Sequence, residues 1–421
     1  MAKKVVNKKK TKKNTSSHVK KTIRKDSKRK DSLFDKKLQF DILDFYIIAI
    51  VISLVSCVGT GFILNYQYKK ENVLYSSSLT SDENLTDFIK TYSEIVDNYY
   101  EEVDRKEILS EATSAMVSYL KDNYSIYLDK DEAELFTNTL DSSYEGIGVV
   151  VAGNVVYNVY EDSPAYNAGI QAGDLIIVVN DVDITDDNVS EIPTLIKDNE
   201  QNHIVVMRDD ERLEFDVETK KIYIPTAGAK VIEKDDHKNG YIALTSFSTK
   251  SASQFRKELE KIEDEGIDSL IIDLRGNSGG YLEVAKEIAG MFLEKGKVIY
   301  SLQSKNDNTV YKDETDEKRD YKIVVLIDSS SASASEVVTG ALKDSYGALV
   351  VGQRSFGKGK VQTVMQKQDS VIKYTSAKWY RPNGECVDGE GITPDYEITN
   401  IIKDNYIYDK QLEKALEVIN E

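Results

Sequence analysis

Residues 322–344 read KIVVLIDSSSASASEVVTGALKD and join an apolar run to an amphipathic run through a serine-rich turn. The run KIVVLID is short, apolar and rich in β-branched residues, which is typical of a buried strand. The run EVVTGALKD has apolar residues at helical spacing, so we expect a helix after the turn. One of the five serines between residues 329 and 335 could be a nucleophile at this junction, or all five could belong to a connecting turn.

Strands and helices alternate around this junction. From about residue 240 the expected strands YIALTSF, SLIIDLRG, KVIYSL and KIVVLID are separated by expected helices such as SASQFRKELEKIEDEG and YLEVAKEIAGMFLEK. The strands are continuous apolar runs, which indicates a sheet that is buried on both faces. The chain is 40% hydrophobic and 30% charged, so it is not globally disordered and has enough apolar residues for more than one core.

The N-terminal region differs sharply from the rest of the chain. Residues 1–38 hold 14 Lys, 2 Arg and 3 Asp, a net charge of +13, whereas the whole chain carries −17. Residues 45–64 are uncharged and long enough to span a bilayer as a helix. Because basic flanks stay on the cytoplasmic side, we expect a cytoplasmic tail over 1–42, a single transmembrane helix over 43–65 and a linker over 66–84. The body is then an extracytoplasmic part of a cell-membrane protein.

Other interpretations of this region are open. The uncharged run could be a buried core helix or a cleaved signal peptide, although the charged region is long and no A-x-A-like site follows it. The motif LVSC, which ends at Cys57, resembles a lipoprotein cleavage box, yet apolar residues continue beyond it. The second cysteine is Cys386, near the other end of the chain, so we expect no intrachain disulfide.

The body divides into segments of different composition. Apolar residues at helical spacing over 85–140 predict a small helical subdomain. Short alternating runs with glycine turns over 141–221 predict a β-rich module with one helix near SEIPTLIKDN. Residues 222–400 form the expected α/β part, and 401–421 the expected C-terminal helix. The glycines of GIG at 146–148 could form an amide nest for a carboxylate, although an isolated GIG is more often a plain turn.

Histidine and metal chemistry are not expected. The three histidines, His18, His203 and His237, lie far apart and none is near a cysteine or a carboxylate cluster, so we expect no metal. No histidine follows residue 237, which argues against a Ser-His-Asp triad beside the serine-rich turn. A serine nucleophile in this region needs another base.

The sequence GQRSFGKG at 352–359 has two competing interpretations. It satisfies the G-x-x-x-x-G-K pattern of a phosphate-binding loop, but Gly359 replaces the required Ser or Thr, and the following KVQTVMQ is strand-like. Alternatively, Lys358 is a base: burial can lower a lysine pKa from about 10.4 toward roughly 7 to 8, where the neutral amine can deprotonate a serine. On spacing alone, a solvated surface lysine is the more common alternative.

Several motifs occur together in one order along the chain. The β-rich module resembles a PDZ domain through SPAYNAGIQAGDLIIVVND, and the remaining motifs resemble those of the carboxyl-terminal processing peptidases, also called tail-specific proteases. The peptidase-like motifs are YSIYLDKDEAELF at 124–136, IIDLRGNSGG at 271–280, SASASEVVTGALKDSYGALVVGQRSFGKGKVQTV at 331–364 and CVDGEGITPDYEI at 386–398. The resemblance covers about residues 85–420 and implies a crotonase-like, mixed α/β peptidase core.

The resemblance also implies roles for individual residues. It makes Ser333 the nucleophile, Lys358 the base, Gln362 the residue that orients the lysine, and the backbone amides of Ala334 and Gly279 the oxyanion donors. The first turn of a helix after Ser333 would supply free amides and positive potential to an oxyanion. The implied peptide-binding residues of the PDZ domain are Tyr144, Gly146, Ile147 and Gly148.

Two local features complicate this assignment. Ser333 and Glu336 also form the S-x-x-E pattern of a capping box, in which the serine only caps a helix. Lys360 departs from the Ser or Thr that is common in the family, and by period two it shares a face with Lys358. Because two inward-pointing ammonium groups would repel, we expect a local irregularity that turns Lys360 to solvent.

The expected function is that of a serine endopeptidase with a Ser/Lys dyad. It would cleave extracytoplasmic polypeptides near their C-termini, after the PDZ domain has captured an apolar C-terminus by strand addition. No cofactor and no nucleic-acid partner are expected, and homodimer formation is left open. The alternatives are a catalytically inactive PDZ peptide-binding scaffold at the membrane and an ATP-binding protein built on GQRSFGKG.

Overall fold

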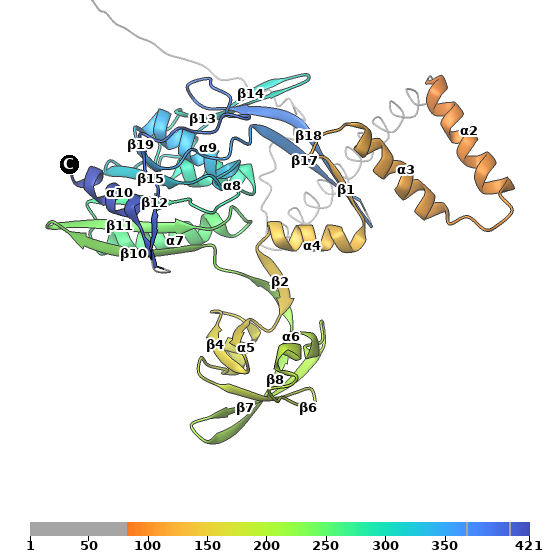
Figure 1. The fold of residues 1–421 in the computed structure, drawn as a ribbon, viewed down its shortest axis with the longest axis horizontal. Coiled ribbons are helices and arrows are strands. Elements are labelled where there is room, and N and C mark those ends of the chain that lie inside the picture. The colour runs from red at the N-terminus through yellow and green to blue at the C-terminus, as the bar shows by residue number, and fades with distance from the viewer. Residues whose placement is uncertain (1–81, 368, 404–405) are drawn as a thin grey trace, which may run out of the picture. The chain divides into compact units, whose positions relative to one another are not determined.

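The computed structural model describes residues 82–367, 369–403 and 406–421 (Figure 1). The predicted cytoplasmic tail and transmembrane helix, and nearly all of the predicted linker, lie outside these residues. No helix in the described part of the chain is long and apolar enough to cross a membrane. The chain divides into two compact units, Met1–Val103 and Asp104–Glu421.

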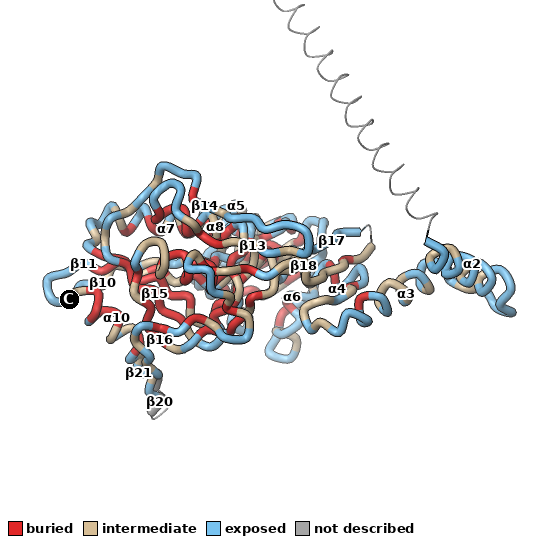
Figure 2. Tube along the Cα trace, turned by 90° about the horizontal axis from the view of Figure 1, so that it is seen from above, coloured by how far each residue is buried: buried red, intermediate tan, exposed pale blue. Residues whose placement is uncertain are grey.

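Three helices form where the sequence has apolar residues at helical spacing. Each begins after an aspartate whose carboxylate accepts hydrogen bonds from first-turn amides, which satisfies otherwise unpaired donors. None of the residues of α2 is buried, and the helix is exposed over most of its length (Figure 2). The helices are α2 (Glu83–Asn98) in the first unit, and α3 (Arg105–Tyr119) and α4 (Lys130–Leu140) in the second.

The β-rich module has its own apolar core, which includes Val156, Ile176 and Ile204. Its sheet has the order β3-β4-β5-β7-β8 with β6 beside β5, so β3 is an edge strand. The first and last strands of the module, β2 and β9, form a separate antiparallel pair. Its elements are β2 (Ser143–Gly146), β3 (Val149–Ala152), β4 (Val155–Val159), α5 (Pro164–Ala168), β5 (Leu175–Val179), β6 (Val182–Asp183), η1 (Val189–Glu191), α6 (Ile192–Leu195), β7 (Gln201–Arg208), β8 (Glu211–Glu218) and β9 (Lys220–Tyr223).

The α/β part is built on a six-stranded sheet with the order β10-β11-β12-β15-β16-β19. The pair β10–β11 is antiparallel and the other pairs are parallel. The strands are β10 (Ala227–Lys234), β11 (His237–Leu244), β12 (Ser269–Asp273), β15 (Lys322–Ile327), β16 (Leu349–Gly352) and β19 (Tyr396–Glu397). The helices are α7 (Ser251–Asp264), α8 (Leu282–Gly290), α9 (Ala334–Ala341), which continues into the π-helical turn η2 (Leu342–Tyr346), and α10 (Lys410–Asn420).

Successive residues of the central strands pack on opposite faces of this sheet. Leu270 and Ile272 of β12 belong to the cluster that includes residues of α7, α8 and α9, whereas Ile271 packs with α10 (Figure 1). All three side chains are fully buried. Each contributes about 1.5–3 kcal/mol by leaving water. Burial on both faces explains why these strands are continuous apolar runs.

A second sheet lies beside the first and supplies one wall of the site described below. Its order is β1-β18-β13-β14, with β17 also paired to β18. The short strand β1 was not predicted from the sequence; it follows α3 and pairs with the distant strand β18. The strands are β1 (Ile126–Leu128), β13 (Val298–Ser304), β14 (Asn308–Lys312), β17 (Lys360–Gln366) and β18 (Val371–Tyr380).

The C-terminal segment differs from the predicted helix over 401–421. A hairpin of β20 (Ile401–Lys403) and β21 (Tyr406–Tyr408) precedes α10, which begins only at Lys410. The sequence IIKDNYIY has β-branched and aromatic residues on both sides of Asp-Asn, which is a hairpin pattern. The helix begins where the Asp409 carboxylate can accept a hydrogen bond from the Leu412 amide.

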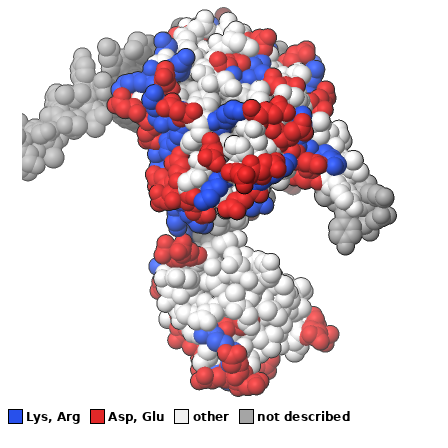
Figure 3. Space-filling view, turned by 90° about the vertical axis from the view of Figure 1, so that its left-hand side faces the viewer, with Lys and Arg blue, Asp and Glu red and all other residues white. Residues whose placement is uncertain are grey.

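Acidic and basic side chains are interspersed on the surface (Figure 3), but one arginine is largely withdrawn from it. The Arg275 guanidinium follows β12 and donates to Asp273 Oδ2 at 2.6 Å and to Asp409 Oδ1 at 2.7 Å. The exposed fraction of the Arg275 side chain is 16%, and that of Asp273 is 8%. Arg275 therefore links the end of β12 to the start of α10, because its guanidinium binds one carboxylate from each. Without Arg275 the two carboxylates would repel each other.

Replacing Arg275 by Met should lower the free energy of unfolding by about 3 kcal/mol, because two carboxylates then lose their shared counter-charge in a poorly solvated place. Urea denaturation followed by circular dichroism measures the change. Lys410→Met is the matched control, since it removes an exposed ion pair with Glu413 in the same helix and should cost less than about 1 kcal/mol. Equal stability of Arg275→Met and the wild-type chain would contradict the role given to Arg275.

Candidate active site

Ser333 lies between β15 and α9, at the junction that the sequence singled out. Its backbone has φ 55° and ψ −113°, a conformation that non-glycine residues seldom adopt. Such a conformation costs on the order of 1–3 kcal/mol and persists only where the surroundings enforce it. Here the Ser333 carbonyl accepts from the Val337 amide at 2.9 Å, so the residue is fixed to the first turn of α9.

The capping-box interpretation of Ser333 is also realised. The Ser333 amide donates to Glu336 Oε2 at 2.8 Å. The reciprocal contact of the box, between the Glu336 amide and the Ser333 side chain, is present, but Oγ makes no regular capping hydrogen bond. The hydroxyl group thus lies close to the start of the helix but makes no regular hydrogen bond with it. Capping therefore does not exclude a chemical role for Ser333.

Glu336 connects Ser333 to Lys358. Its carboxylate is fully buried and accepts four hydrogen bonds. Oε1 accepts from Ser355 Oγ at 2.6 Å and from the Gly357 amide at 2.7 Å, and Oε2 accepts from the amides of Ser333 at 2.8 Å and Lys358 at 2.9 Å. Burial raises the pKa of the Glu336 carboxyl, and the four hydrogen bonds oppose this shift. One carboxylate therefore fixes the backbone of both residues.

Four of the predicted site residues line one cavity of about 370 Å³: Ser333, Lys358, Gln362 and Gly279. The other lining residues come from α4, from the loops after β11 and β12, from the start of α8 and from the second sheet. They are Phe136, Thr139, Leu140, Ser246, Ser278, Gly280, Tyr281, Leu282, Val361, Val364 and Lys373. This lining contains two lysines and no acidic residue, and it is otherwise small or apolar, which suits an extended polypeptide.

The environment of Lys358 favours a neutral amine. Burial lowers the pKa of Lys358, the positive charge of Lys373 lowers it further, and Glu336 opposes both effects. Burial also lowers the pKa of Lys373, whose Nζ lies 5.1 Å from the centroid of the Phe136 ring. Neither lysine forms an ion pair with another described residue. Both lysines of the cavity thus have lowered pKa values, and Lys358 is the one whose backbone amide Glu336 holds together with that of Ser333.

The pairing of β17 with β18 is irregular, but the irregularity lies beyond Lys360 and not between Lys358 and Lys360. The pairing of β17 with β18 shifts register between Val361 and Gln362, which places both of these consecutive residues in the cavity lining. Lys360 turns not to open solvent but to Asp122, with 2.9 Å between Nζ and Oδ1. The hydrogen bond with Asp122 raises the pKa of Lys360, so this lysine stays charged.

The two predicted oxyanion donors differ in availability. Ala334 is the first residue of α9, where a helix offers no carbonyl partner to the amide. Gly279 adopts φ 104° close to Ser333, and a Cβ there would lie 2.9 Å from the Ser333 Cβ. However, the Gly279 amide donates to Asn277 Oδ1 at 2.9 Å, so it is not free in this structure. Ala334 is the better placed of the two donors.

The predicted peptide-binding residues line a second cavity of about 140 Å³ in the β-rich module: Tyr144, Gly146, Ile147 and Gly148. The cavity lies between the edge strand β3 and helix α6, and residues such as Val149, Val151, Ile192 and Ile196 make it largely apolar. A free strand edge beside an apolar pocket suits an extended peptide with an apolar side chain at its end.

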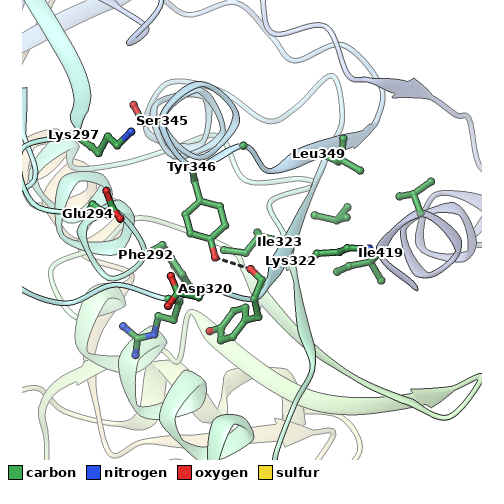
Figure 4. A pocket seen from close by; sticks show the side chains of 15 residues that line it. Phe292, Glu294, Lys297, Asp320, Lys322, Ile323, Ser345, Tyr346, Leu349 and Ile419 are labelled. Carbon is green, nitrogen blue, oxygen red and sulfur yellow. Dashed lines mark hydrogen bonds between the residues drawn. The ribbon is translucent and has the colours of Figure 1, made fainter. Parts of the chain in front are cut away.

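A further cavity of the described chain contains none of the predicted site residues. A cavity of about 550 Å³ lies at the start of β15, the opposite end of the strand from Ser333 (Figure 4). There the Tyr346 hydroxyl donates to the Tyr321 carbonyl at 2.6 Å. The GQRSFGKG segment leads into strand β17 and not into a helix, so a phosphate would find no helix N-terminus. Among the described residues no His, Cys, Asp or Glu cluster could hold a metal ion.

Sequence reasoning missed several residues of the site. Lys373 was not noticed because an isolated lysine in a strand has no motif. Glu336 was considered only as a helix cap, although its position three residues after Ser333 was known. Tyr124 begins one of the motifs quoted above, but its position in the fold could not be inferred from the sequence.

Three family models match the chain. Peptidase family S41 matches residues 238–398, a PDZ domain matches 155–208, and the N-terminal domain of the activating protease CtpB matches 59–132. The first of these segments contains Ser333, Lys358 and Gln362, and the second contains most of the β-rich module.

Curated relatives agree with these matches. The carboxy-terminal processing protease CtpB of Bacillus subtilis is 36% identical over 315 residues, which are 72% of this chain and 66% of CtpB. CtpA of the same organism is 32% identical over 360 residues, 84% of this chain and 76% of CtpA. A probable CtpA-like serine protease of Staphylococcus aureus is 32% identical over 373 residues, 86% of this chain and 73% of that protein. The chain therefore belongs to the carboxy-terminal processing proteases, serine peptidases of family S41 that carry a PDZ domain.

Proposed function

We propose that the chain is an endopeptidase that cleaves polypeptides near their C-termini with a dyad of Ser333 and Lys358. The observation that carries this proposal is that both residues line one cavity while Glu336 binds both of their backbone amides. The rival proposal, an inactive peptide-binding scaffold, gives no reason for a depressed lysine pKa beside a serine in a strained conformation.

The proposed chemistry needs only residues of this chain. The neutral Lys358 amine takes the proton of Ser333 Oγ, and the oxygen attacks the substrate carbonyl carbon. The Ala334 amide stabilises the oxyanion, and the Lys358 ammonium then gives its proton to the leaving amine. Water hydrolyses the resulting acyl ester by the same route. We assign the role of orienting Lys358 to Gln362, which lines the same cavity and whose Nε2 donates to Thr375 Oγ1 at 3.3 Å.

The proposed substrates are polypeptides with apolar C-termini. Such a terminus would extend the sheet at the edge strand β3, with its last side chain in the apolar cavity beside α6 and its carboxylate at residues 146–148. Residues 146–148 line this cavity, and a glycine has no Cβ of its own to hinder the approach of a carboxylate to its backbone amide.

We further propose that residues 43–65 anchor the protein in the cell membrane, with residues 1–42 in the cytoplasm and the peptidase outside it. The support is the uncharged run over 45–64 behind a tail with a net charge of +13 over residues 1–38. Substrates would then be extracytoplasmic proteins.

Ser333→Ala should abolish cleavage of an unstructured polypeptide with an apolar C-terminus, and it should lower the unfolding free energy by about 1 kcal/mol or less through the weakened cap. Cleavage is followed by mass spectrometry of the products. Ser330→Ala is the matched control, since Ser330 lies in the same turn with an exposed side chain and should retain full activity. Undiminished cleavage by Ser333→Ala would reject the dyad.

The rate of cleavage should rise with pH through an apparent pKa below the ordinary lysine value, because only the neutral Lys358 amine acts as the base. Lys373→Leu removes a like charge but keeps the site apolar, so the pKa of Lys358 should rise and the rising limb should move to higher pH by about one unit. Lys378→Met, which removes an ion-paired lysine on the same strand, serves as the control. A rising limb that stays in place in Lys373→Leu would contradict this account of Lys358.

Protease added to intact cells should digest the peptidase and the PDZ domain but leave a fragment that contains residues 1–42, because the basic tail is retained on the cytoplasmic side. Immunoblots with epitope tags at each end read out the two parts. A protected C-terminal tag beside an accessible N-terminal tag would reverse the proposed topology.

A further inference from the structure

The turn between α3 and β1, residues 121–125, lies against the active-site sheet. The Ser125 amide donates to the Asp122 carbonyl at 3.0 Å, which closes the turn, and β1 begins at the next residue and pairs with β18. This turn belongs to the motif D-x-Y-S-x-Y-L at 122–128, between α3 and α4, and no role in the dyad mechanism above has been given to it. Its contacts are with β17, through Lys360, and with the paired strand β18, through Thr375.

Asp122 is the centre of these contacts. Its carboxylate accepts from Lys360 Nζ at 2.9 Å, from Thr375 Oγ1 at 2.6 Å and from Ser125 Oγ at 2.7 Å. Although burial opposes it, hydrogen bonds from Thr375, Ser125 and Lys360 lower the pKa of Asp122 to about 2, so the group is ionised at neutral pH. Asp122 therefore neutralises the lysine nearest to Lys358 in sequence.

Asp122 also reaches Gln362 through Thr375. The Thr375 hydroxyl gives its single proton to Asp122, so its oxygen is left as an acceptor for Gln362 Nε2 at 3.3 Å. The Thr375 amide donates to Ser125 Oγ at 3.1 Å, which fixes the same residue a second time. Because Gln362 donates to Thr375 through Nε2, its Oε1 atom is the end of the amide that is turned away from Thr375.

Tyr124 contacts both lysines. Its ring centroid lies 5.2 Å from Lys358 Nζ and 5.4 Å from Lys360 Nζ. A ring in this position excludes water from one side of Lys358, which favours the neutral amine. Attraction of an ammonium to the ring would raise the pKa of Lys358 instead, but it is worth only about 0.5–1 kcal/mol at a partly exposed site, which is less than about one pKa unit. Burial can shift a lysine pKa by several units.

We propose that Asp122 and Tyr124 are positioning residues of the active site. In this inference, which rests on the proposed Ser333/Lys358 dyad, Asp122 holds Lys360 and Gln362 in place and Tyr124 keeps water away from Lys358. The helical segment before the PDZ domain thus completes the site of a peptidase whose other residues come from the α/β part. A purely mechanical role, in which the turn only attaches α3 to the sheet, is the competing explanation.

The charged groups around Lys358 set the sign of each effect. Lys373 on β18 faces it with a like charge, Glu336 on α9 with an opposite one, and Lys360 and Asp122 together contribute little net charge. Asp388, in the loop after β18, lies against Gly359 and is paired with Lys378 at 2.9 Å. Loss of the Asp122 charge therefore adds a net positive charge near Lys358, whereas loss of the Tyr124 ring admits water.

The two variants should shift the pH profile of the full-length protein in opposite directions. In Asp122→Asn the rising limb of kcat/KM against pH should move down by about one unit, since the added positive charge disfavours the ammonium of Lys358. Its plateau should fall about tenfold because Gln362 is no longer fixed. In Tyr124→Ala the limb should move up by about one unit. Tyr124→Phe should return the limb to its wild-type position.

The matched control is Asp369→Asn. Asp369 forms an ion pair with Lys106 of α3 at 2.7 Å, so its loss weakens the attachment of the same segment without touching the cavity. The profile should not move in this variant. Lowered rates with an unmoved profile in Asp122→Asn and Tyr124→Ala, or shifts of equal sign in all three variants, would establish the mechanical role and overturn our proposal.

A second measurement separates this inference from the proposed function. In the Ser333→Ala background, the rate at which an amine-acylating reagent modifies Lys358 is followed against pH by peptide mapping, which reports the pKa of Lys358 without catalysis. The shifts should be those given above: downward with Asp122→Asn and upward with Tyr124→Ala. Unshifted reactivity overturns the inference even if the dyad is correct, whereas full activity of Ser333→Ala rejects the dyad whatever the turn variants do.

Discussion

The carboxylate of Glu336 determines how the rest of the site is arranged. A buried carboxylate is tolerable only when its lone pairs are satisfied, and here four donors from two loops converge on it. Two of these donors are the backbone amides of Ser333 and Lys358, which are far apart in the sequence. The relative position of Ser333 and Lys358 is therefore set by hydrogen bonds from their backbone amides, which tolerate far less movement than a contact between two flexible side chains.

Three neighbouring lysines, Lys358, Lys360 and Lys373, have pKa values that are shifted in different directions. Lys360 has a carboxylate partner, and its pKa is raised. Lys358 and Lys373 have none among the described residues, and burial lowers the pKa of both. The chain as a whole is acidic, with a net charge of −17, yet no acidic residue lines this cavity. The cavity therefore differs in charge from the rest of the chain. A base without histidine depends on it.

The sequence was sufficient for features that depend on local pattern. Continuous apolar runs predicted strands buried on both sides, as Ile271 and Ile272 show by packing on opposite faces. Resemblance to a family brought Ser333, Lys358 and Gln362 together before any geometry was known. Period two, combined with the repulsion of like charges, predicted an irregularity that turns Lys360 to solvent, whereas the register shift follows Val361 and Lys360 pairs with Asp122.

Features that depend on distant contacts were beyond the sequence. Asp122 and Lys360 are separated by 238 residues, and nothing in either segment marks them as partners. The engagement of the Gly279 amide by Asn277 follows from loop geometry that no spacing reveals. The C-terminal segment was taken for one helix, because the hairpin pattern of IIKDNYIY is short and lies directly before a strongly amphipathic run.

The strained backbone of Ser333 can be maintained because α9 cannot move to relieve it. Every residue of this helix, from Ala334 to Ala341, is buried, and Val337, Val338 and Ala341 lie in the main core cluster. A helix that is buried all round is held by packing on each side, and shifting it would open voids that cost more than the strain. The unfavourable φ of one serine, on the order of 1–3 kcal/mol, is small beside the burial of those side chains. The same packing that makes the fold stable thus keeps Ser333 at the N-terminus of α9, beside the Ala334 amide to which we assign the stabilisation of the oxyanion.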